Sequence, residues 1–120
     1  FACRFWRRSE MDVLVIDDNL DVAKTTAAIF RALGCIAELE TLPKSALRKI
    51  KTACPDLIIM DVGMPEMNGY ELCEQLRGEG YDDLIIVAHT GWGGAADKQR
   101  ARQAGFTVLK RTSGGEFERQ

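Results

Sequence analysis

The stretch VLVIDDN, residues 13–19, begins with four consecutive large apolar residues and ends with two aspartates and an asparagine. A short unbroken run of β-branched residues and leucine is typical of a strand that is buried on both faces of a parallel sheet. We therefore predict a central strand over Val13–Ile16, which delivers Asp17 and Asp18 to its carboxyl end. Asn19 can then cap a following helix, because its side-chain oxygen can accept a backbone N–H of the first turn.

The same alternation of apolar strand and amphipathic helix recurs along the chain. Further strands are predicted over residues 35–39, 57–60, 84–88 and 106–109. The segments between them carry apolar residues at helical spacing. After residue 110 the signal fades, so the last helix is expected to be weak or truncated. Strands alternating with helices indicate βα units and an α/β, doubly wound parallel sheet.

Polar residues follow the carboxyl ends of the predicted strands. These residues are Asp17, Asp18, Asp61, Thr90 and Lys110. In open parallel sheets, ligands bind outside the carboxyl ends of the strands. Three carboxylates that converge there repel one another, and burying them unpaired is costly, so a cation must offset their charge. Oxygen ligands without thiolate or imidazole suit a hard cation, which we expect to be Mg²⁺.

Phosphoryl transfer is the chemistry that this set of residues suits. A carboxylate can attack phosphorus and form an aspartyl phosphate, and Asp61 stands alone at a strand end, facing the pair from another strand. Such transfer needs mainly positioning and charge neutralisation, which Mg²⁺ and the ammonium of Lys110 can supply. The hydroxyl of Thr90 and the backbone N–H groups after Asp61 can bind the remaining oxygens.

Four segments together resemble the response-regulator receiver domains of two-component signalling, including the chemotaxis regulators. They are VLVIDDN (13–19), LIIMDVGMPEMNGYEL (57–72), HTGWG (89–93) and AGF-x₃-K (104–110). The resemblance implies a flavodoxin-like fold with five parallel strands in the order 2-1-3-4-5. It also implies that a sensor histidine kinase or phosphotransfer protein phosphorylates the domain, whose affinity for a downstream partner then changes.

The resemblance also implies a role for each residue of the site. Asp61 is similar to the phosphoacceptor, Asp18 to a direct Mg²⁺ ligand, and Asp17 to a ligand that acts mainly through water. The backbone carbonyl of Gly63 would complete the protein's share of the metal ligands.

The resemblance makes Thr90 the switch hydroxyl and Lys110 its ion-pair partner at the phosphoryl group. Receivers usually follow this lysine with proline, whereas Arg111 and Thr112 follow it here, and Thr107 stands where an aromatic residue is expected. These departures keep a second hypothesis open. The chain would then be a degenerate pseudo-receiver, a protein-interaction module that works without phosphorylation.

A third class, the haloacid-dehalogenase-like phosphatases, also uses an aspartate nucleophile and Mg²⁺. Such an enzyme needs a second aspartate two residues after the nucleophile, and Gly63 occupies that position. We therefore expect no enzyme here, beyond a domain that catalyses its own phosphorylation and dephosphorylation.

Composition narrows the partners and the compartment. Sixteen Lys and Arg against eighteen Asp and Glu give a net charge of −2, so this domain is not expected to bind nucleic acid. No apolar run is long enough for a membrane span. The four cysteines are scattered without C-x-x-C spacing, and the chain has a single histidine, so a zinc site is not expected. The cysteines are instead read as free thiols of a protein in a reducing, cytoplasmic compartment.

The first ten residues differ in composition from the rest of the chain. They combine Arg4, Arg7 and Arg8 with Phe5 and Trp6. Either this is a basic, aromatic arm that binds a membrane surface or a partner, or it is a linker. Three arginines make a weak electrostatic patch, which favours the linker. We divide the chain into an arm or linker over residues 1–10 and a receiver domain over residues 11–120.

Overall fold

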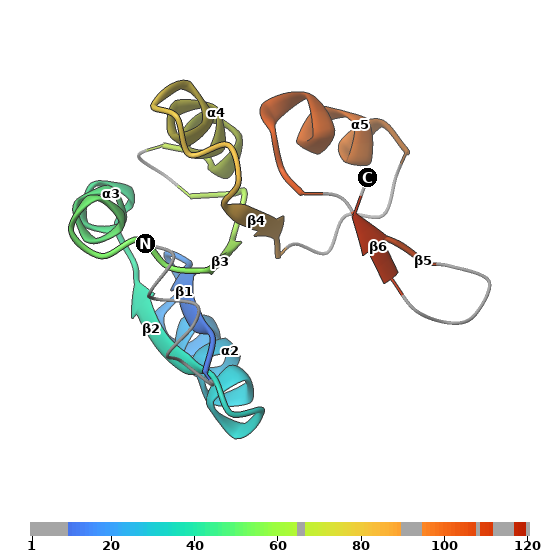
Figure 1. Ribbon diagram of the computed structural model, residues 1–120. Helices are drawn as coiled ribbons and strands as arrows, with labels where there is room; N and C mark the ends of the chain where they lie inside the picture. Colours follow the sequence, from blue (N-terminus) through green and yellow to red (C-terminus); the bar gives the residue numbers. More distant parts are fainter. Residues whose placement is uncertain (1–9, 65–66, 90–94, 108, 112–116, 120) are drawn as a thin grey trace.

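A parallel sheet forms the centre of the computed structural model, which describes residues 10–64, 67–89, 95–107, 109–111 and 117–119 (Figure 1). Its strands are β1 (Asp12–Ile16), β2 (Ile36–Glu40), β3 (Leu57–Met60) and β4 (Ile85–Ala88). The strand order is β2-β1-β3-β4, and all neighbouring strands are parallel. The predicted α/β class and the first four positions of the predicted order are confirmed.

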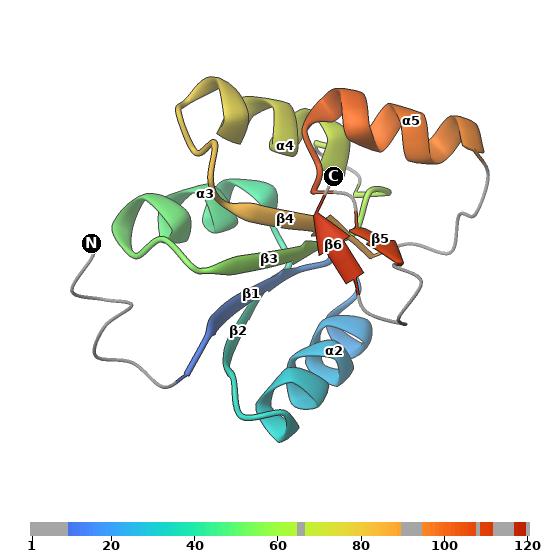
Figure 2. The same ribbon diagram turned by 45° about the vertical axis from the view of Figure 1, so that its right-hand side comes forward.

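Helices cover both faces of this sheet, as Figures 1 and 2 show. They are α2 (Leu20–Ala32), α3 (Pro43–Thr52), α4 (Gly69–Gly78) and α5 (Ala95–Ala104). α2 packs on one face, while α3, α4 and α5 lie on the other. A helix had been expected between each pair of successive predicted strands. None of the described helices combines the length and the apolar character needed to cross a bilayer.

Side chains alternate between the two faces along each strand, as the pleat of a strand requires. Leu14, Ile58 and Ile86 point toward α3, α4 and α5, where they join the larger core cluster. Val13 and Ile59 point toward α2, into a smaller cluster that contains Ala23 and Ala27 of that helix. Burial on both faces explains why these strands read as unbroken apolar runs.

The fifth strand departs from the expectation. We predicted it over residues 106–109, parallel to β4 and ending at Lys110. In the structure β5 comprises Leu109–Arg111 and pairs antiparallel with β6 (Phe117–Arg119) in a separate two-stranded sheet. Lys110 thus lies within the strand rather than beyond its end. In the described part of the C-terminal segment, the expected weak helix is replaced by β6.

Thr107 supplies the physical reason for this change. Its N–H donates to the carbonyl oxygen of Ile86 at 2.7 Å, as in a parallel ladder. The N–H of Ile86, however, donates to the Thr107 hydroxyl at 3.2 Å, so a side chain replaces the backbone carbonyl of a regular ladder. The start of a fifth strand is therefore present at the edge of β4. β5 itself finds its backbone partners in β6, because unpaired backbone groups are costly.

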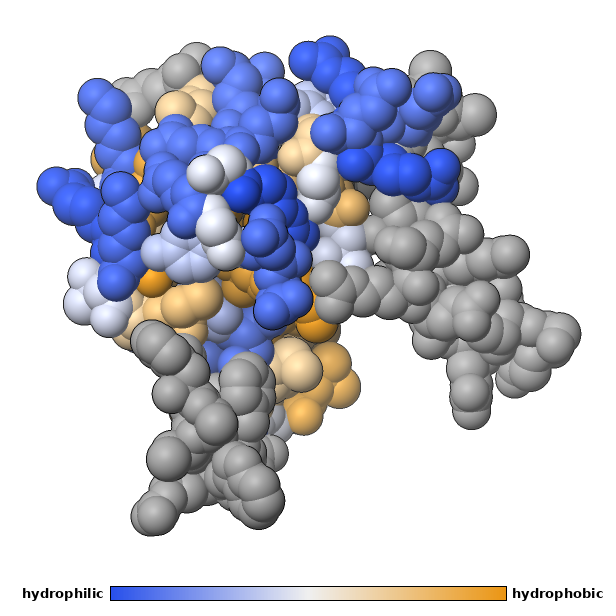
Figure 3. Space-filling model, turned by 45° about the horizontal axis from the view of Figure 1, so that its top comes forward, coloured by the Kyte–Doolittle hydropathy of each residue, from blue (hydrophilic) through white to orange (hydrophobic). Residues whose placement is uncertain are grey.

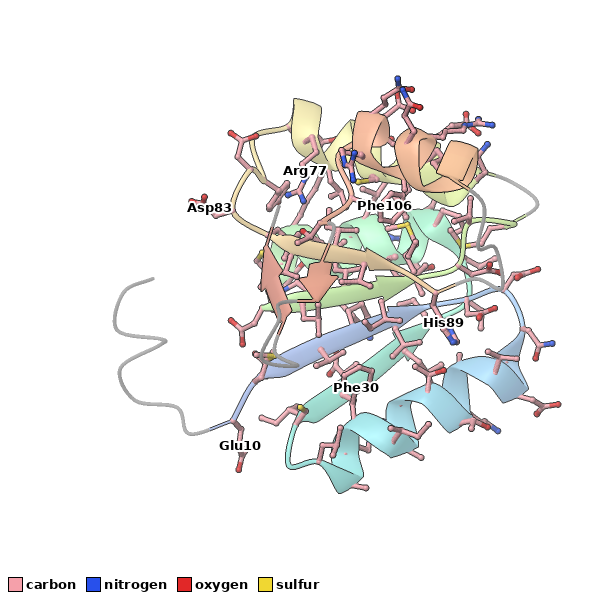
Figure 4. The ribbon with its side chains drawn as sticks, turned by 90° about the vertical axis from the view of Figure 1, so that its right-hand side faces the viewer. Glu10, Phe30, Arg77, Asp83, His89 and Phe106 are labelled. Atoms are coloured by element: carbon pink, nitrogen blue, oxygen red, sulfur yellow. The ribbon has the colours of Figure 1, made fainter. Side chains whose placement is uncertain are left out.

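Arg77 ties the carboxyl end of α4 to the segments around β4. Its guanidinium donates to the carbonyl oxygens of Gly105 at 2.9 Å and of Leu84 at 2.7 Å, and also to that of Tyr81. Gly105 ends α5 with a φ of 103°, which favours glycine, and a Cβ there would lie 2.7 Å from the Arg77 Cγ atom. Figure 4 shows Arg77 between α4 and the segment that leads to Phe106.

Replacing Arg77 by methionine is expected to lower the free energy of unfolding by about 2–3 kcal/mol, because several carbonyl acceptors lose a charged donor together. Urea denaturation followed by circular dichroism measures the change. Arg48→Met is the matched control, since Arg48 is exposed and, among the described residues, donates a single long hydrogen bond, to Ser45 at 3.4 Å. Equal destabilisation by the two variants would show that Arg77 does not hold these segments together.

Candidate metal centre

The register of the sheet brings two of the predicted aspartates together at one edge. Ile16 of β1 is paired with Met60 of β3, so the residues that follow, Asp17 and Asp61, leave their strands side by side. The Asp61 N–H donates to the Ile16 carbonyl oxygen at 2.9 Å and prolongs this pairing. Parallel strands thus place the two carboxylates at the carboxyl edge of the sheet.

Three carboxylates form a cluster at this edge. One oxygen atom from each of Asp17, Asp18 and Asp61 lies within 4.8 Å of the others. The Asp17 side chain is buried, with 5% of the residue exposed, whereas Asp61 is half-buried and Asp18 exposed. The cluster therefore has a buried side against the sheet and an open side toward solvent, through which a ligand could approach.

Backbone N–H groups orient two of these carboxylates. Asn19 donates its N–H to Asp17 Oδ1 at 2.9 Å, and Gly63 donates its N–H to Asp61 Oδ1 at 3.2 Å. The Asn19 side chain also accepts the N–H of Val22 at 3.2 Å and so caps α2, as predicted. The residues that follow each aspartate therefore hold its carboxylate near the edge of the sheet.

Burial is the main cause that raises the pKa of the Asp17 carboxyl above its ordinary value. The hydrogen bond from Asn19 opposes this shift, while the charges of Asp61 and Asp18 add to it. A positive charge on His89 would lower the same pKa. Figure 4 shows His89 at this end of the sheet. Burial and the neighbouring carboxylates thus both disfavour the charged form of Asp17.

This set of donors fits a hard divalent cation. Two like charges 4–5 Å apart in partly buried surroundings repel by roughly 3–4 kcal/mol, which a bound cation would offset. All three side chains offer carboxylate oxygens and none offers sulfur, and such ligands suit Mg²⁺ or Ca²⁺ rather than a softer metal. The cluster could therefore hold a metal ion.

Replacing Asp17 by asparagine is expected to raise the free energy of unfolding at neutral pH in the presence of a chelator. The folded state raises the pKa of Asp17, so it binds the proton more tightly than the unfolded chain does. The wild type should accordingly lose stability as the pH rises from the ordinary aspartate pKa through the raised value. Asp17→Asn should flatten this pH dependence, and thermal unfolding at several pH values measures it.

The response of the melting temperature to Mg²⁺ provides the second half of this test. Binding to the folded state stabilises it, so added Mg²⁺ should raise the melting temperature of the wild type more than that of Asp17→Asn. Asp21→Asn, an exposed aspartate in the first turn of α2, should behave as the wild type in both experiments. An unchanged pH profile in Asp17→Asn would contradict the electrostatic account of the cluster.

The other predicted site residues have different positions in the structure. Gly63 is exposed and lies two residues after Asp61 in the loop that follows β3. Thr90 and the side chain of Lys110 lie outside the described residues. The backbone of Lys110 is paired with Glu118 in the hairpin of β5 and β6. The structure thus brings the three aspartates together, while the roles predicted for them and for Gly63, Thr90 and Lys110 stay predictions.

Gly69 supports the site in a way that the sequence did not reveal. Its N–H donates to the Val62 carbonyl oxygen at 2.8 Å. A Cβ on Gly69 would lie 2.7 Å from the Asp61 carbonyl oxygen and 2.8 Å from Val62 Cα. Asn68 caps α4 and forms a capping box with Glu71 at this point. The glycine was visible in the sequence as part of a turn, but its contact with the Asp61 backbone depends on how the loop closes.

Comparison with known proteins gives consistent results. A family model for the response regulator receiver domain matches residues 13–113. The chain is 37% identical over 94 residues to the response regulator MprA of Mycobacterium tuberculosis, covering 78% of this chain and 39% of MprA. It is also 33% identical over 102 residues to an uncharacterized 14.6 kDa protein of Leptolyngbya boryana, covering 82% of this chain and 76% of that protein.

A solved structure agrees with these sequence matches. The chemotaxis response regulator CheY4 of Vibrio cholerae superposes with a TM-score of 0.77 at 28% identity, covering 82% of this chain and 83% of CheY4. The chain spans only 39% of the length of MprA, so the match concerns one part of that protein.

Proposed function

This chain belongs to the response regulator receiver domain family, and from that premise we propose that it accepts a phosphoryl group on Asp61 within a two-component phosphorelay. The observation that carries this proposal is the acidic cluster. Asp61 is half-buried at the carboxyl edge of the sheet, within 4.8 Å of a buried and an exposed aspartate. A nucleophilic carboxylate in this position can meet a phosphoryl donor from the solvent side.

The proposed reaction is a transfer of one phosphoryl group between two proteins. A carboxylate oxygen of Asp61 attacks the phosphorus of a phosphohistidine, and the bond from phosphorus to the imidazole nitrogen breaks. The imidazole leaves with the electron pair and later takes a proton from water, while Asp61 becomes an acyl phosphate. The hydrogen bond from the Gly63 N–H holds Asp61 Oδ1, which leaves the second oxygen available for attack.

In this proposal Asp17, Asp18 and Asp61 hold Mg²⁺ together with the Gly63 backbone carbonyl. When bound, the cation supplies neutralisation of charge on the transferred phosphoryl oxygens. Asp17 is the buried carboxylate of the set, and it would act on the cation mainly through a water molecule. Exposed Asp18 would contact the cation directly from the solvent side.

Two further residues complete the proposed switch. The Thr90 hydroxyl would donate to a phosphoryl oxygen, and the Lys110 ammonium would pair with the same group. Added charge at Asp61 then changes the populations of two conformations, and the surface near α5 and the end of β4 changes its affinity for a partner. The hydroxyl of Thr107 already joins that region to Ile86 in β4.

The proposed partner is a cytoplasmic sensor histidine kinase or a phosphotransfer protein. A receiver of similar fold, from the yeast response regulator Ssk1, has been solved with the histidine phosphotransfer protein Ypd1, and it matches this chain with a TM-score of 0.74 at 24% identity. The net charge of −2 supports a protein partner rather than nucleic acid for this domain.

The proposal is tested by incubating the protein with acetyl phosphate, with and without Mg²⁺, and measuring its intact mass. Here the phosphorus–oxygen bond of the donor breaks and acetate leaves. We expect one added phosphoryl group per chain in the incubation with Mg²⁺, and none in the incubation in which a chelator has removed Mg²⁺ from the start. Circular dichroism confirms that both samples are folded.

The absence of an adduct on a folded protein that still binds Mg²⁺ would leave the pseudo-receiver, a module that docks without being phosphorylated. The replacement of the expected proline by Arg111 and the altered fifth strand support that alternative. The intact acidic cluster supports the phosphoacceptor, because an interaction module has no need to hold three repelling carboxylates together.

A further inference from the structure

A groove lies at the amino edge of the sheet, at the opposite end from the acidic cluster. It contains a cavity of about 120 Å³ between β1, β2 and the carboxyl end of α3. Apolar atoms of Leu14, Ile36, Ala53 and Pro55 contribute to its lining. Ile36 lies on the edge strand and is 45% exposed, although it faces the same side of the sheet as α3. The helix therefore ends before it covers this part of β2.

The rim of the groove carries more negative than positive charge. Asp12 and Glu38 line it together with Lys49, whose ammonium lies 3.3 Å from the Glu38 carboxylate. The Glu38 side chain is 61% exposed despite that ion pair. The Asp56 carboxylate lies beside this rim, where it accepts the N–H of Asp12 at 2.8 Å. A segment that presents apolar side chains and positive charge would complement this surface.

The first nine residues of the chain combine apolar side chains with arginines, and the described chain that they precede begins beside the groove. The Ile36 N–H donates to the carbonyl oxygen of Met11 at 2.9 Å, so the chain enters β1 next to the exposed Ile36 side chain. Figure 4 shows Glu10 at this end of the sheet and His89 at the other. Nine extended residues reach up to about 30 Å, so residues 1–9 can reach every part of the groove.

We propose that the groove binds the chain's own residues 1–9, with the aromatic pair Phe5–Trp6 against the cavity and the arginines of the arm against the acidic rim. An aromatic ring can cover the apolar part of the lining, to which Leu14, Ile36, Ala53 and Pro55 contribute. Attachment at Met11 also makes the binding intramolecular, which raises the effective concentration of the arm at the groove. Because the groove lies away from Asp61, docking leaves the acidic cluster open.

An apolar face on α2 is an alternative docking surface for the arm. Figure 3 shows one face of the molecule, where hydrophilic side chains cover most of the described surface and apolar ones appear in smaller areas. Ile29 of α2 is 55% exposed, and Leu33, the residue that caps the carboxyl end of α2, is 73% exposed. Both are more exposed than Ile36. Neither residue lines the groove, so they supply a control position.

The test uses the fluorescence of Trp6 in the full chain. Trp6 and Trp92 are the two tryptophans, so Trp92→Phe leaves Trp6 as the sole reporter. We expect emission at shorter wavelength than that of a solvent-exposed indole and several-fold weaker quenching by acrylamide. Adding Ile36→Arg should shift the emission to longer wavelength and restore quenching, whereas Leu33→Arg should change neither. High salt should weaken the protection, because it screens the arginines from the rim.

Ala53→Arg provides a second variant on the α3 side of the groove, in case Ile36→Arg disturbs β2. A nuclear Overhauser contact between the Trp6 indole and the Ile36 methyl groups would support the proposal directly. An indole that is fully quenched in every variant would overturn it, as would protection that is lost in Leu33→Arg but kept in Ile36→Arg and Ala53→Arg. Protection that appears only at high protein concentration would also overturn it, since the groove would then bind the arm of a second copy.

Discussion

Asp61→Asn is expected to abolish the phosphoryl adduct completely, because the amide cannot act as the nucleophile and no other carboxylate takes its place. Asp17 is buried and accepts the Asn19 N–H, and Asp18 belongs to the loop after β1 rather than to the loop of Asp61. Incubation with acetyl phosphate and Mg²⁺ followed by intact-mass analysis should show the added group on the wild type and none on the variant. Reduction of the acyl phosphate converts the labelled aspartate into a stable alcohol. Peptide mapping of the reduced wild type should then locate the modified residue at position 61.

The matched control for this loss is Asp21→Asn. Asp21 is an exposed aspartate in the first turn of α2 and is outside the set of three, so this variant should be labelled at the wild-type level. A second readout separates lost chemistry from lost structure. The charge of Asp61 contributes to the raised pKa of Asp17, so Asp61→Asn should be more stable than the wild type in chelator at neutral pH. A label that persists on Asp61→Asn would assign the phosphoacceptor to another residue.

Gly69→Ala is expected to disturb both the stability and the chemistry of the domain. The new Cβ would lie 2.7 Å from the Asp61 carbonyl oxygen, so the backbone that carries the phosphoacceptor must move. Overpacking of this kind costs about 1–3 kcal/mol in unfolding free energy. Since a displacement of about 1 Å can cost a hundredfold in rate, labelling by acetyl phosphate should slow by about tenfold to a hundredfold.

Gly78→Ala is the control at the other end of the same helix. Gly78 is exposed, and a Cβ there would meet nothing within 4 Å. Alanine has the higher helix propensity, so this variant should be as stable as the wild type or gain up to about 1 kcal/mol. Chemical denaturation and the labelling rate are measured for both variants. If Gly69→Ala matched Gly78→Ala in both measurements, the contact between Gly69 and the Asp61 backbone would have no structural importance.

Most of the fold could be predicted from local patterns. The apolar runs 13–16 and 57–60 became β1 and β3 because a strand buried on both faces needs apolar side chains on both. Asn19 became the cap of α2 because its side chain could satisfy a free N–H of the first turn. The position of the aspartates after these strands was enough to predict a cluster, since parallel strands end at the same edge.

The C-terminal part shows where such patterns fail. Residues 106–109 are apolar enough for a strand, but their pattern does not determine which edge the strand joins. That choice depended on Thr107, whose hydroxyl takes the backbone position beside Ile86, and on the pairing of β5 with β6, the next strand along the chain. The edge that a strand joins depends on its tertiary contacts, so its own residues carry little signal for that choice.

The sequence by itself determined the class of the fold, the order of its elements up to α5 and the residues that can carry the chemistry, because strand burial, helix capping and donor type are local properties. The tertiary structure alone decided the 4.8 Å grouping of the carboxylates, the burial that raises the Asp17 pKa, the contact of Gly69 with Asp61 and the groove beside Ile36. These features depend on distances between segments that only packing brings together.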